Sequence, residues 1–125
     1  MKVKYKKIYS HKLNDEIKIP TSKSYANRAL ILGALSNDCN IVADIPSSSD
    51  VKEMIDVLTS LSLGRVNDHD EIVLDKSFPE DEVVSDSVQE VYLGEGGTTI
   101  RFLLSFLALG CNTYEVKVHP RFKSR

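Results

Sequence analysis

The arrangement of helix-like and strand-like segments in this sequence predicts an α+β domain in which helices pack against mixed sheets. Apolar residues recur at helical spacing in three segments, and short strand-like runs lie between them. A polar or glycine-rich start, an amphipathic helix and short strands follow one another in two successive blocks. The 125 residues are 42% hydrophobic and 27% charged, so the chain can bury a core and has an ordinary globular composition.

Two strands are expected before the first helix. Residues Val3–Tyr9 nearly alternate between lysine and apolar side chains, which is typical of a half-exposed strand with a basic outer face. These lysines fit the protection of an exposed strand edge better than a binding surface. A second short strand is expected at Glu16–Ile19 and ends at Pro20.

The first two helices have recognisable starts. Thr21 and Ser22 offer N-cap hydroxyls for a helix that runs to about Leu35. Asp50 is followed three residues later by a glutamate, a capping-box arrangement with aspartate as the cap. Gly64 is expected to stop this second helix. The apolar residues at helical spacing within it are Val51, Met54, Ile55, Leu58 and Leu61.

The remaining elements follow the same alternation. A third helix is expected from Thr98 to Leu109, ended by Gly110. Residues Ser77–Ser87 are acidic and predict an exposed loop or weak edge. Short strands are expected at Ile41–Asp44, Glu71–Leu74, Val88–Leu93 and Thr113–Val118, and a basic segment at His119–Arg125.

Charge and hydropathy argue against several classes of function. The net charge is −2 and the pI about 5.9, so no global positive field recruits nucleic acid or an acidic membrane. The longest apolar stretches, Ala29–Leu35 and Ile100–Gly110, are about half the length that spans a bilayer. Cys39 and Cys111 belong to no CxxC or metal pattern, and no signal peptide is recognisable. Reduced thiols in a cytoplasmic protein are therefore expected, and a disulfide between the two is disfavoured.

The first candidate anion site is the segment Thr21–Arg28. A helix that starts here leaves backbone N–H groups unpaired beside the positive end of the helix dipole. Lys23 adds a point charge, and Ser24 lies four residues before Arg28, so the latter two share one helix face. Such a cluster suits a phosphate or carboxylate. The same residues fit ordinary capping and solvated cations equally well, and no P-loop motif precedes them.

The second candidate anion site is the segment Leu93–Arg101. Glycines between a strand and a helix, among them Gly97, allow a tight turn and a close approach of the backbone to a ligand. The helix start again supplies N–H donors. A plain strand-to-helix turn capped by Thr98 is equally compatible with these residues, and the dinucleotide fingerprint GxGxxG is not matched.

A third cluster of cations comprises Arg121, Lys123 and Arg125. Taken alone, it is more typical of a solvated segment than of a binding site. The three histidines are scattered without the spacing of metal ligands, and no residue pair forms an evident nucleophile and base. The residues themselves therefore predict no metal site and leave the catalytic groups unidentified.

Four segments of the chain occur in one order that is characteristic of a known family. They are Pro20-Thr21-Ser22-Lys23-Ser24 with Asn27-Arg28-Ala29-Leu30, then Ser48-Ser49-Asp50-Val51 before Met54, then Leu93-Gly94-Glu95-Gly96-Gly97-Thr98-Thr99-Ile100-Arg101, and Pro120-Arg121-Phe122-Lys123-Ser124-Arg125. Together they span nearly the whole chain, and they resemble the corresponding motifs of the N-terminal portion of 5-enolpyruvylshikimate-3-phosphate synthases.

The resemblance implies a reaction and a set of ligands. The family transfers the enolpyruvyl group of phosphoenolpyruvate to the 5-hydroxyl of shikimate 3-phosphate and releases phosphate, without a metal or organic cofactor. By resemblance, Lys23 lies between both substrates, and Ser24 and Arg28 hold shikimate 3-phosphate. Gly97 brings backbone N–H groups to phosphoenolpyruvate, and Arg125 pairs with its anionic groups. Because two polyanions must be held together, clustered cations and helix starts suit this task.

The resemblance also implies a fold, namely βαβαββ units that form part of an inside-out α/β barrel. Residues 1–20 would be initial strands of the other lobe, and residues 21–125 the first and most of the second unit of the substrate-binding lobe. Family members are several times longer and typically monomeric. The chain is therefore expected to be a fragment with a partial site, with its acid and base residues downstream of Arg125. Alone, it should be inactive and prone to self-association through exposed apolar surface.

Three positions depart from the family pattern. Thr21 stands where glycine is usual, Ser49 where aspartate is common, and Glu95 where asparagine is common. A carboxylate at position 95 would repel phosphoenolpyruvate unless it points away or pairs with a cation.

Three other functions compete with this interpretation. A UDP-N-acetylglucosamine enolpyruvyl transferase shares the fold, but the Ser-Lys-Ser…Asn-Arg opening fits it less well. A non-catalytic anion-binding module of the same fold would bind without chemistry. An RNA-terminal phosphate enzyme of related fold is disfavoured by the acidic pI.

Overall fold

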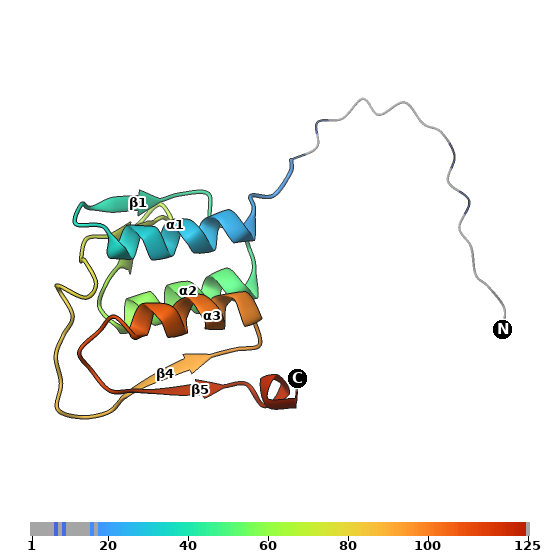
Figure 1. Ribbon diagram of the computed structural model, residues 1–125. Helices are drawn as coiled ribbons and strands as arrows, with labels where there is room; N and C mark the ends of the chain where they lie inside the picture. Colours follow the sequence, from blue (N-terminus) through green and yellow to red (C-terminus); the bar gives the residue numbers. More distant parts are fainter. Residues whose placement is uncertain (1–6, 8, 10–15, 17, 125) are drawn as a thin grey trace.

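The computed structural model describes residues 7, 9, 16 and 18–124 (Figure 1). The strand expected at Val3–Tyr9 falls largely outside the described residues. Residues 16, 18 and 19 of the strand expected at Glu16–Ile19 are described, and none of them is in a strand. Arg125, the last of the predicted site residues, also lies outside the described residues. Within the part of the chain that is described, no helix is both long and apolar enough to cross a membrane.

Helices and strands alternate along the described chain. In order, they are α1 (Lys23–Leu35), β1 (Asn40–Val42), α2 (Ser49–Ser60), β2 (Arg65–Val66), β3 (Ile72–Leu74), β4 (Gln89–Leu93), α3 (Gly97–Leu107), β5 (Tyr114–Val118) and the 3-10 helix η1 (Pro120–Ser124). The first three strands form an antiparallel sheet in the order β1-β3-β2, and β4 pairs in parallel with β5. The predicted α+β class is confirmed.

The three helices lie side by side in a layer between the two sheets (Figure 1). Helix α1 contacts β1 and β3 on one side, and α2 contacts β4 on the other. All three residues of β3 are buried, because this strand is the centre of its sheet and faces the helices. The first residues of α1, α2 and α3 lie at the same end of the layer (Figure 1).

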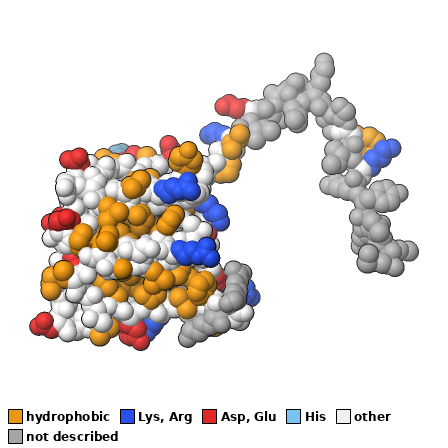
Figure 2. Space-filling view, viewed as in Figure 1, with side chains coloured by type: hydrophobic (Ala, Val, Ile, Leu, Met, Phe, Trp, Pro, Cys, Tyr) orange, Lys and Arg blue, Asp and Glu red, His pale blue; other side chains and the backbone are white. Residues whose placement is uncertain are grey.

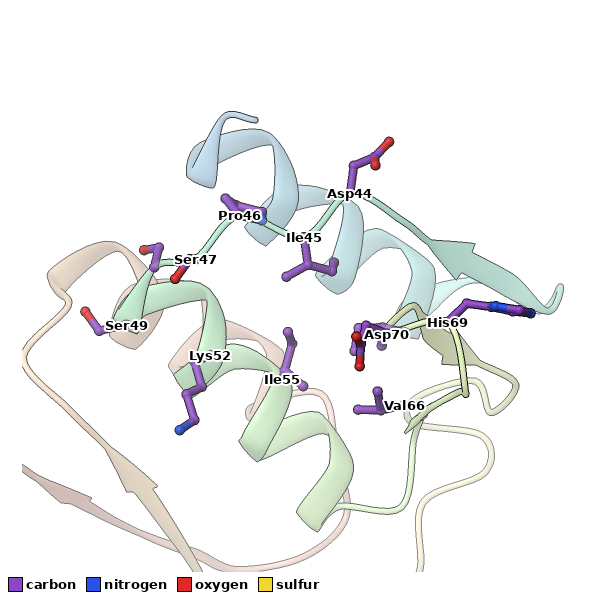
Figure 3. Close-up of a pocket in the computed structure, with 12 residues that line it drawn as sticks. Asp44, Ile45, Pro46, Ser47, Ser49, Lys52, Ile55, Val66, His69 and Asp70 are labelled. Carbon is purple, nitrogen blue, oxygen red and sulfur yellow. The ribbon is translucent and has the colours of Figure 1, made fainter. Parts of the chain in front are cut away.

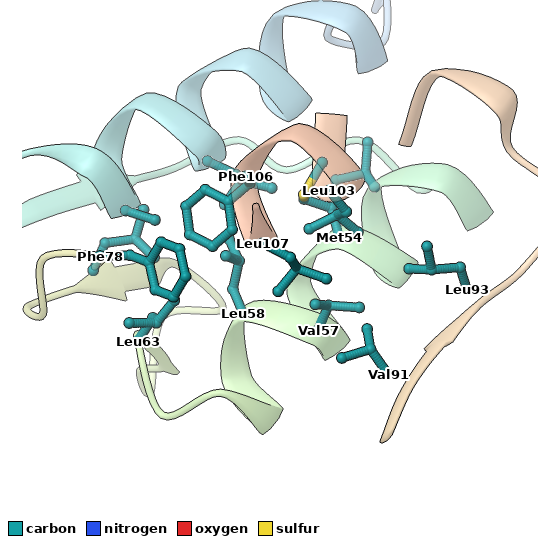
Figure 4. Packing of buried hydrophobic residues seen from close by; sticks show 14 of the residues in the cluster. Met54, Val57, Leu58, Leu63, Phe78, Val91, Leu93, Leu103, Phe106 and Leu107 are labelled. Carbon is teal, nitrogen blue, oxygen red and sulfur yellow. The ribbon is translucent and has the colours of Figure 1, made fainter. Parts of the chain in front are cut away.

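One hydrophobic cluster joins the helices and both sheets (Figure 4). Its centre contains Met54 and Leu58 of α2 and Leu103 of α3, all almost completely buried. The ring of Phe106 stacks on Phe78, with centroids 4.2 Å apart and planes 20° from parallel. The core therefore ties the two successive blocks of the sequence into one unit.

The prediction of an exposed loop at Ser77–Ser87 is wrong at its beginning. Phe78 is only 1% exposed, and its N–H donates to the carbonyl of Ala34 at 2.8 Å. The free energy of burying an aromatic side chain is favourable enough to hold the beginning of an acidic loop against the core. The remainder of the segment has no strand and is mostly exposed, as expected.

The predicted cap of α2 is also corrected. The N-cap is Ser48, whose side chain makes no capping bond, and Asp50 lies in the first turn of the helix. Lys23 reaches the Asp50 carboxylate from α1, so this carboxylate serves a contact between helices. A similar shift occurs at α3, where Gly96 rather than Thr98 is the N-cap.

The end of α2 is set by a serine and not by Gly64. Ser62 has φ of 59°, the left-handed conformation, and its N–H donates to the carbonyl of Thr59 at 3.0 Å. The N–H of Leu63 donates to the carbonyl of Leu58, also at 3.0 Å. These two bonds form a Schellman motif, which satisfies carbonyls at the helix end. Gly64 instead lets the backbone pass close to β3.

Candidate functional site

The starts of the three helices border one hollow of about 550 Å³. Helix α1 contributes Lys23, helix α2 its first turn, and helix α3 its first residues with the preceding loop. The lining residues are Lys23, Ser49, Asp50, Glu53, Glu95, Gly96, Gly97 and Thr98. Each helix start presents N–H groups without intrahelical partners, and three such starts at one place favour an anionic ligand.

Lys23 is the only lysine or arginine among the described residues that line this hollow. Its ammonium lies 3.0 Å from Oδ2 of Asp50, and its side chain is 63% exposed whereas that of Asp50 is 21% exposed. Ser22 accepts a hydrogen bond from the N–H of Tyr25 and so fixes the start of α1 just before Lys23. A pair this exposed adds little stability, but it orients the ammonium beside the starts of α2 and α3.

Carboxylates also line the hollow and oppose the binding of an anion. Asp50 and Glu53 lie on the first turns of α2, and Glu95 lies in the loop before α3. Oε2 of Glu53 is buried without a hydrogen-bond partner among the described residues. The sequence prediction did not include the carboxylate of Glu53, since nothing local indicates that it faces the loop before α3.

The glycines before α3 allow this loop to pass over α2. A Cβ atom on Gly94 would overlap the Glu53 carboxylate, and one on Gly96 would lie 2.6 Å from Oδ1 of Asp50. A Cβ atom on Gly97 would meet nothing within 4 Å. The close approach expected from the glycines is thus made to α2 at the first two positions, and open space for a ligand lies at Gly97.

Glu95 pairs with two groups that follow β5. Its Oε1 lies 3.6 Å from Nδ1 of His119 and 3.9 Å from Nη1 of Arg121. Pairing with a cation was one of the two conditions under which a carboxylate at this position is compatible with a bound anion. The basic segment after β5 therefore reaches the loop before α3.

The structure brings two of the five predicted site residues into the hollow. Lys23 and Gly97 both line it. Ser24 is half-buried and Arg28 exposed one turn further along α1, outside the set of described residues that line the hollow. Arg125 lies outside the described residues, so its predicted position is untested.

A larger hollow, of about 590 Å³, lies elsewhere, between α2 and the turn from β2 to β3 (Figure 3). Ile45 and Ile55 face one another across it, with Asp44, His69 and Asp70 near its edge (Figure 3). None of the predicted site residues that the structure describes lines it. The smaller hollow is the better candidate for binding polyanions, because it alone of the two combines several helix starts with Lys23.

No group of three or more His, Cys, Asp or Glu side chains is arranged to hold a metal ion in the described part of the chain. Cys39 and Cys111 are free and exposed. The groups that the described part of the hollow offers to a ligand are helix starts, Lys23 and carboxylates.

Comparison with known proteins identifies the family. The family model described as EPSP synthase (3-phosphoshikimate 1-carboxyvinyltransferase) matches residues 9–125. A 3-phosphoshikimate 1-carboxyvinyltransferase of Vibrio atlanticus (strain LGP32) is 34% identical over 114 residues, and that of Vibrio vulnificus (strain YJ016) 34% identical over 119 residues. One from Escherichia coli O1:K1 / APEC is 32% identical over 114 residues. Each comparison covers 91% of this chain but 27% of the relative. The chain belongs to the EPSP synthase family.

Proposed function

We propose that this chain provides part of the substrate site of a 3-phosphoshikimate 1-carboxyvinyltransferase. The reaction would join the enolpyruvyl group of phosphoenolpyruvate to the 5-hydroxyl of shikimate 3-phosphate, through a tetrahedral addition intermediate, and release phosphate. The observation that carries the proposal is the meeting of three helix starts and Lys23 at one hollow. The relatives described above are named for the shikimate reaction, which favours it over transfer to UDP-N-acetylglucosamine.

The residues divide between the two substrates. Lys23 projects from the start of α1 beside the starts of α2 and α3, so its ammonium would lie between the two anions. Ser24 and Arg28 would hold shikimate 3-phosphate along α1, and the open space at Gly97 would admit phosphoenolpyruvate to the N–H groups of α3. Arg125 would pair with phosphoenolpyruvate. Fixed cations and dipoles bring the substrates together and so replace a chance encounter by an oriented one.

The order of elements supports a division into repeated units. From α1 to β3 the order is helix, strand, helix, strand, strand, which are the last five elements of a βαβαββ unit. From β4 to β5 the order is strand, helix, strand, which begins a second unit. We assign residues 21–125 to these two units of the substrate-binding lobe and residues 1–20 to strands of the other lobe. The inside-out barrel would arise from further units of this kind.

The 125 residues alone should show negligible turnover. They span 27% of the length of the relatives, and no catalytic acid or base was assigned within them. Clear release of phosphate from the two substrates by this chain would contradict the assignment of only a partial site.

The proposal is tested by a two-dimensional NMR titration with shikimate 3-phosphate, with unphosphorylated shikimate as the control ligand. We expect saturable shifts at Lys23, Ser24 and Arg28 with the phosphate ester only. A Lys23→Met variant should weaken these shifts, whereas the matched variant Lys52→Met, also on an exposed lysine, should not. If nothing moves at millimolar ligand in a folded sample, the proposed half-site is wrong for this chain.

A further inference from the structure

Glu95 occupies a position where a negative charge should oppose the proposed function. It lies in the loop just before α3 and lines the same hollow as Gly97 and Thr98, the first residues of α3. An anion bound there would meet like charge from Glu95 as well as from Asp50 and Glu53 of α2. The charge of Glu95 must therefore be offset if an anion is to bind well at Gly97.

The chain supplies that offset from the segment after β5. The N–H of His119 lies 3.2 Å from the carbonyl of Leu93 and 3.4 Å from that of Gly94, so the strand pairing of β4 and β5 continues to this residue. The pairing places His119 beside the loop that carries Glu95. Its Nδ1 then lies 3.6 Å from the Glu95 carboxylate, and Arg121 approaches the same oxygen at 3.9 Å.

His119 has a second neighbour at the same ring atom. The N–H of Arg121 donates to Nδ1 at 3.3 Å, an arrangement that needs a neutral ring with its proton on the other nitrogen. When the ring is protonated, Nδ1 carries a proton and can donate to Glu95 instead. Histidine is the side chain that ordinarily changes charge near neutral pH.

We propose that His119 and Arg121 set the anion affinity at the start of α3 by neutralising Glu95, and that this affinity rises when His119 gains a proton. The inference rests on the proposed function, because it concerns the anion site at Gly97. His119 acts through Glu95 and is a positioning residue. The other charged groups that line the hollow are Lys23 on α1 and Asp50 and Glu53 on α2.

A double-mutant cycle on the 125-residue chain separates this role from direct contact with the anion. The variants are Glu95→Gln, His119→Gln and the combination of the two. Binding is followed by the amide shifts of Gly96, Gly97 and Thr98 with phosphoenolpyruvate and with sulfate. Sulfate serves for the pH series between about pH 5.5 and about pH 8, where histidine titrates, since its own charge does not change there.

We expect Glu95→Gln to tighten binding and His119→Gln to weaken it by about two- to fivefold at the acidic end of the series. In the Glu95→Gln background, His119→Gln should have little effect, and the rise in affinity toward low pH should shrink. A His119→Lys variant should keep tight binding at all these pH values. As a matched control, Lys117→Gln removes a cation of β5 that pairs with Glu90, and it should leave binding at Gly97 unchanged.

Two results would overturn the inference. The first is an equal loss from His119→Gln in both backgrounds, which would mean that the ring contacts the anion itself. The second is an anion affinity at Gly97 that none of the three variants changes, which leaves the proposed function standing. Failure of the proposed function looks different, because neither phosphoenolpyruvate nor sulfate would then shift Gly97 in any variant, and shikimate 3-phosphate would not shift Lys23.

Discussion

Glu82 shows how one carboxylate can fix a loop. It accepts hydrogen bonds from the N–H of Cys111 at 2.6 Å, from the backbone and side-chain amides of Asn112 at 3.3 and 2.8 Å, and from the Tyr114 hydroxyl. Partial burial acts to raise the pKa of Glu82, but these hydrogen bonds together lower it below its ordinary value. The same arrangement, burial first and the bond to Glu82 second, raises the pKa of Tyr114 to about 12.

The lowered pKa of Glu82 predicts a pH-dependent contribution to stability. The folded state binds this proton less readily than the unfolded state, so the contribution is present above the ordinary pKa of 4.5 and is lost as the pH falls through the folded value. At neutral pH, Glu82→Gln should lower the free energy of unfolding by about 1–2 kcal/mol, allowing for partial exposure. Urea unfolding at several pH values measures this difference, which should shrink below about pH 4.5.

A carboxylate in the same loop provides the control for Glu82. Asp86 is exposed, so Asp86→Asn should change stability by no more than about 0.5 kcal/mol at any of these pH values. If Glu82→Gln and Asp86→Asn behave alike, the hydrogen bonds of Glu82 do not hold the loop.

The site could be predicted in part at the level of residues. Lys23 and Gly97 lie at helix starts, and a helix start can be recognised from local sequence because its caps and glycines are neighbours in the chain. The position of Glu53 under Gly94 depends on how α2 packs beside the loop before α3, which no local pattern encodes. The pairing of Glu95 with His119 likewise depends on the register of β4 and β5, which could not be predicted from local sequence.

Among the elements, the longer ones were predicted well. Helix α1 runs to Leu35 as expected, and β4 and β5 lie within one residue of their expected ends. Strand β2 was missed because its two residues are too few to show an alternation. Helix caps were less reliable than helices, since Ser48 and Ser62 took the places expected for Asp50 and Gly64. Cap positions follow backbone geometry, and several neighbouring residues can satisfy it.

The contact between the end of α2 and β3 gives a prediction at this scale. A Cβ atom on Gly64 would lie 2.9 Å from the carbonyl oxygen of Val73 and 2.7 Å from Cδ2 of Leu74. Because a backbone atom of the central strand cannot easily move, Gly64→Ala should lower the free energy of unfolding by about 1–3 kcal/mol. Urea unfolding of the variant and of the unchanged chain measures the loss.

Gly97→Ala is the matched control for Gly64→Ala, since its Cβ atom would enter open space in the first turn of α3. It should leave stability unchanged or raise it slightly, because alanine favours the helix more than glycine does. Equal losses from the two substitutions would show that the approach of Gly64 to β3 does not limit packing.

Part of the helical layer is exposed in the part of the molecule that the structure describes. Hydrophobic side chains form two bands on one face, over α1 and over α3 (Figure 2). Among the exposed apolar residues are Tyr25 and Leu32 of α1 and Leu104 of α3, of which Leu32 is 66% and Leu104 48% exposed. Exposed apolar side chains gathered on helices commonly mark a surface that another protein segment covers.

This surface predicts that the 125-residue chain self-associates. In sedimentation equilibrium, its average mass should rise above 14.0 kDa as concentration increases, because association removes the two bands from water.

The double variant Leu32→Glu, Leu104→Glu should stay near 14.0 kDa, since burying two carboxylates without partners is unfavourable. Val83→Glu, Val84→Glu places the same charges on exposed residues of the loop between β3 and β4, so it should associate as the unchanged chain does. A mass of 14.0 kDa at every concentration for the unchanged chain would show that these bands do not drive association.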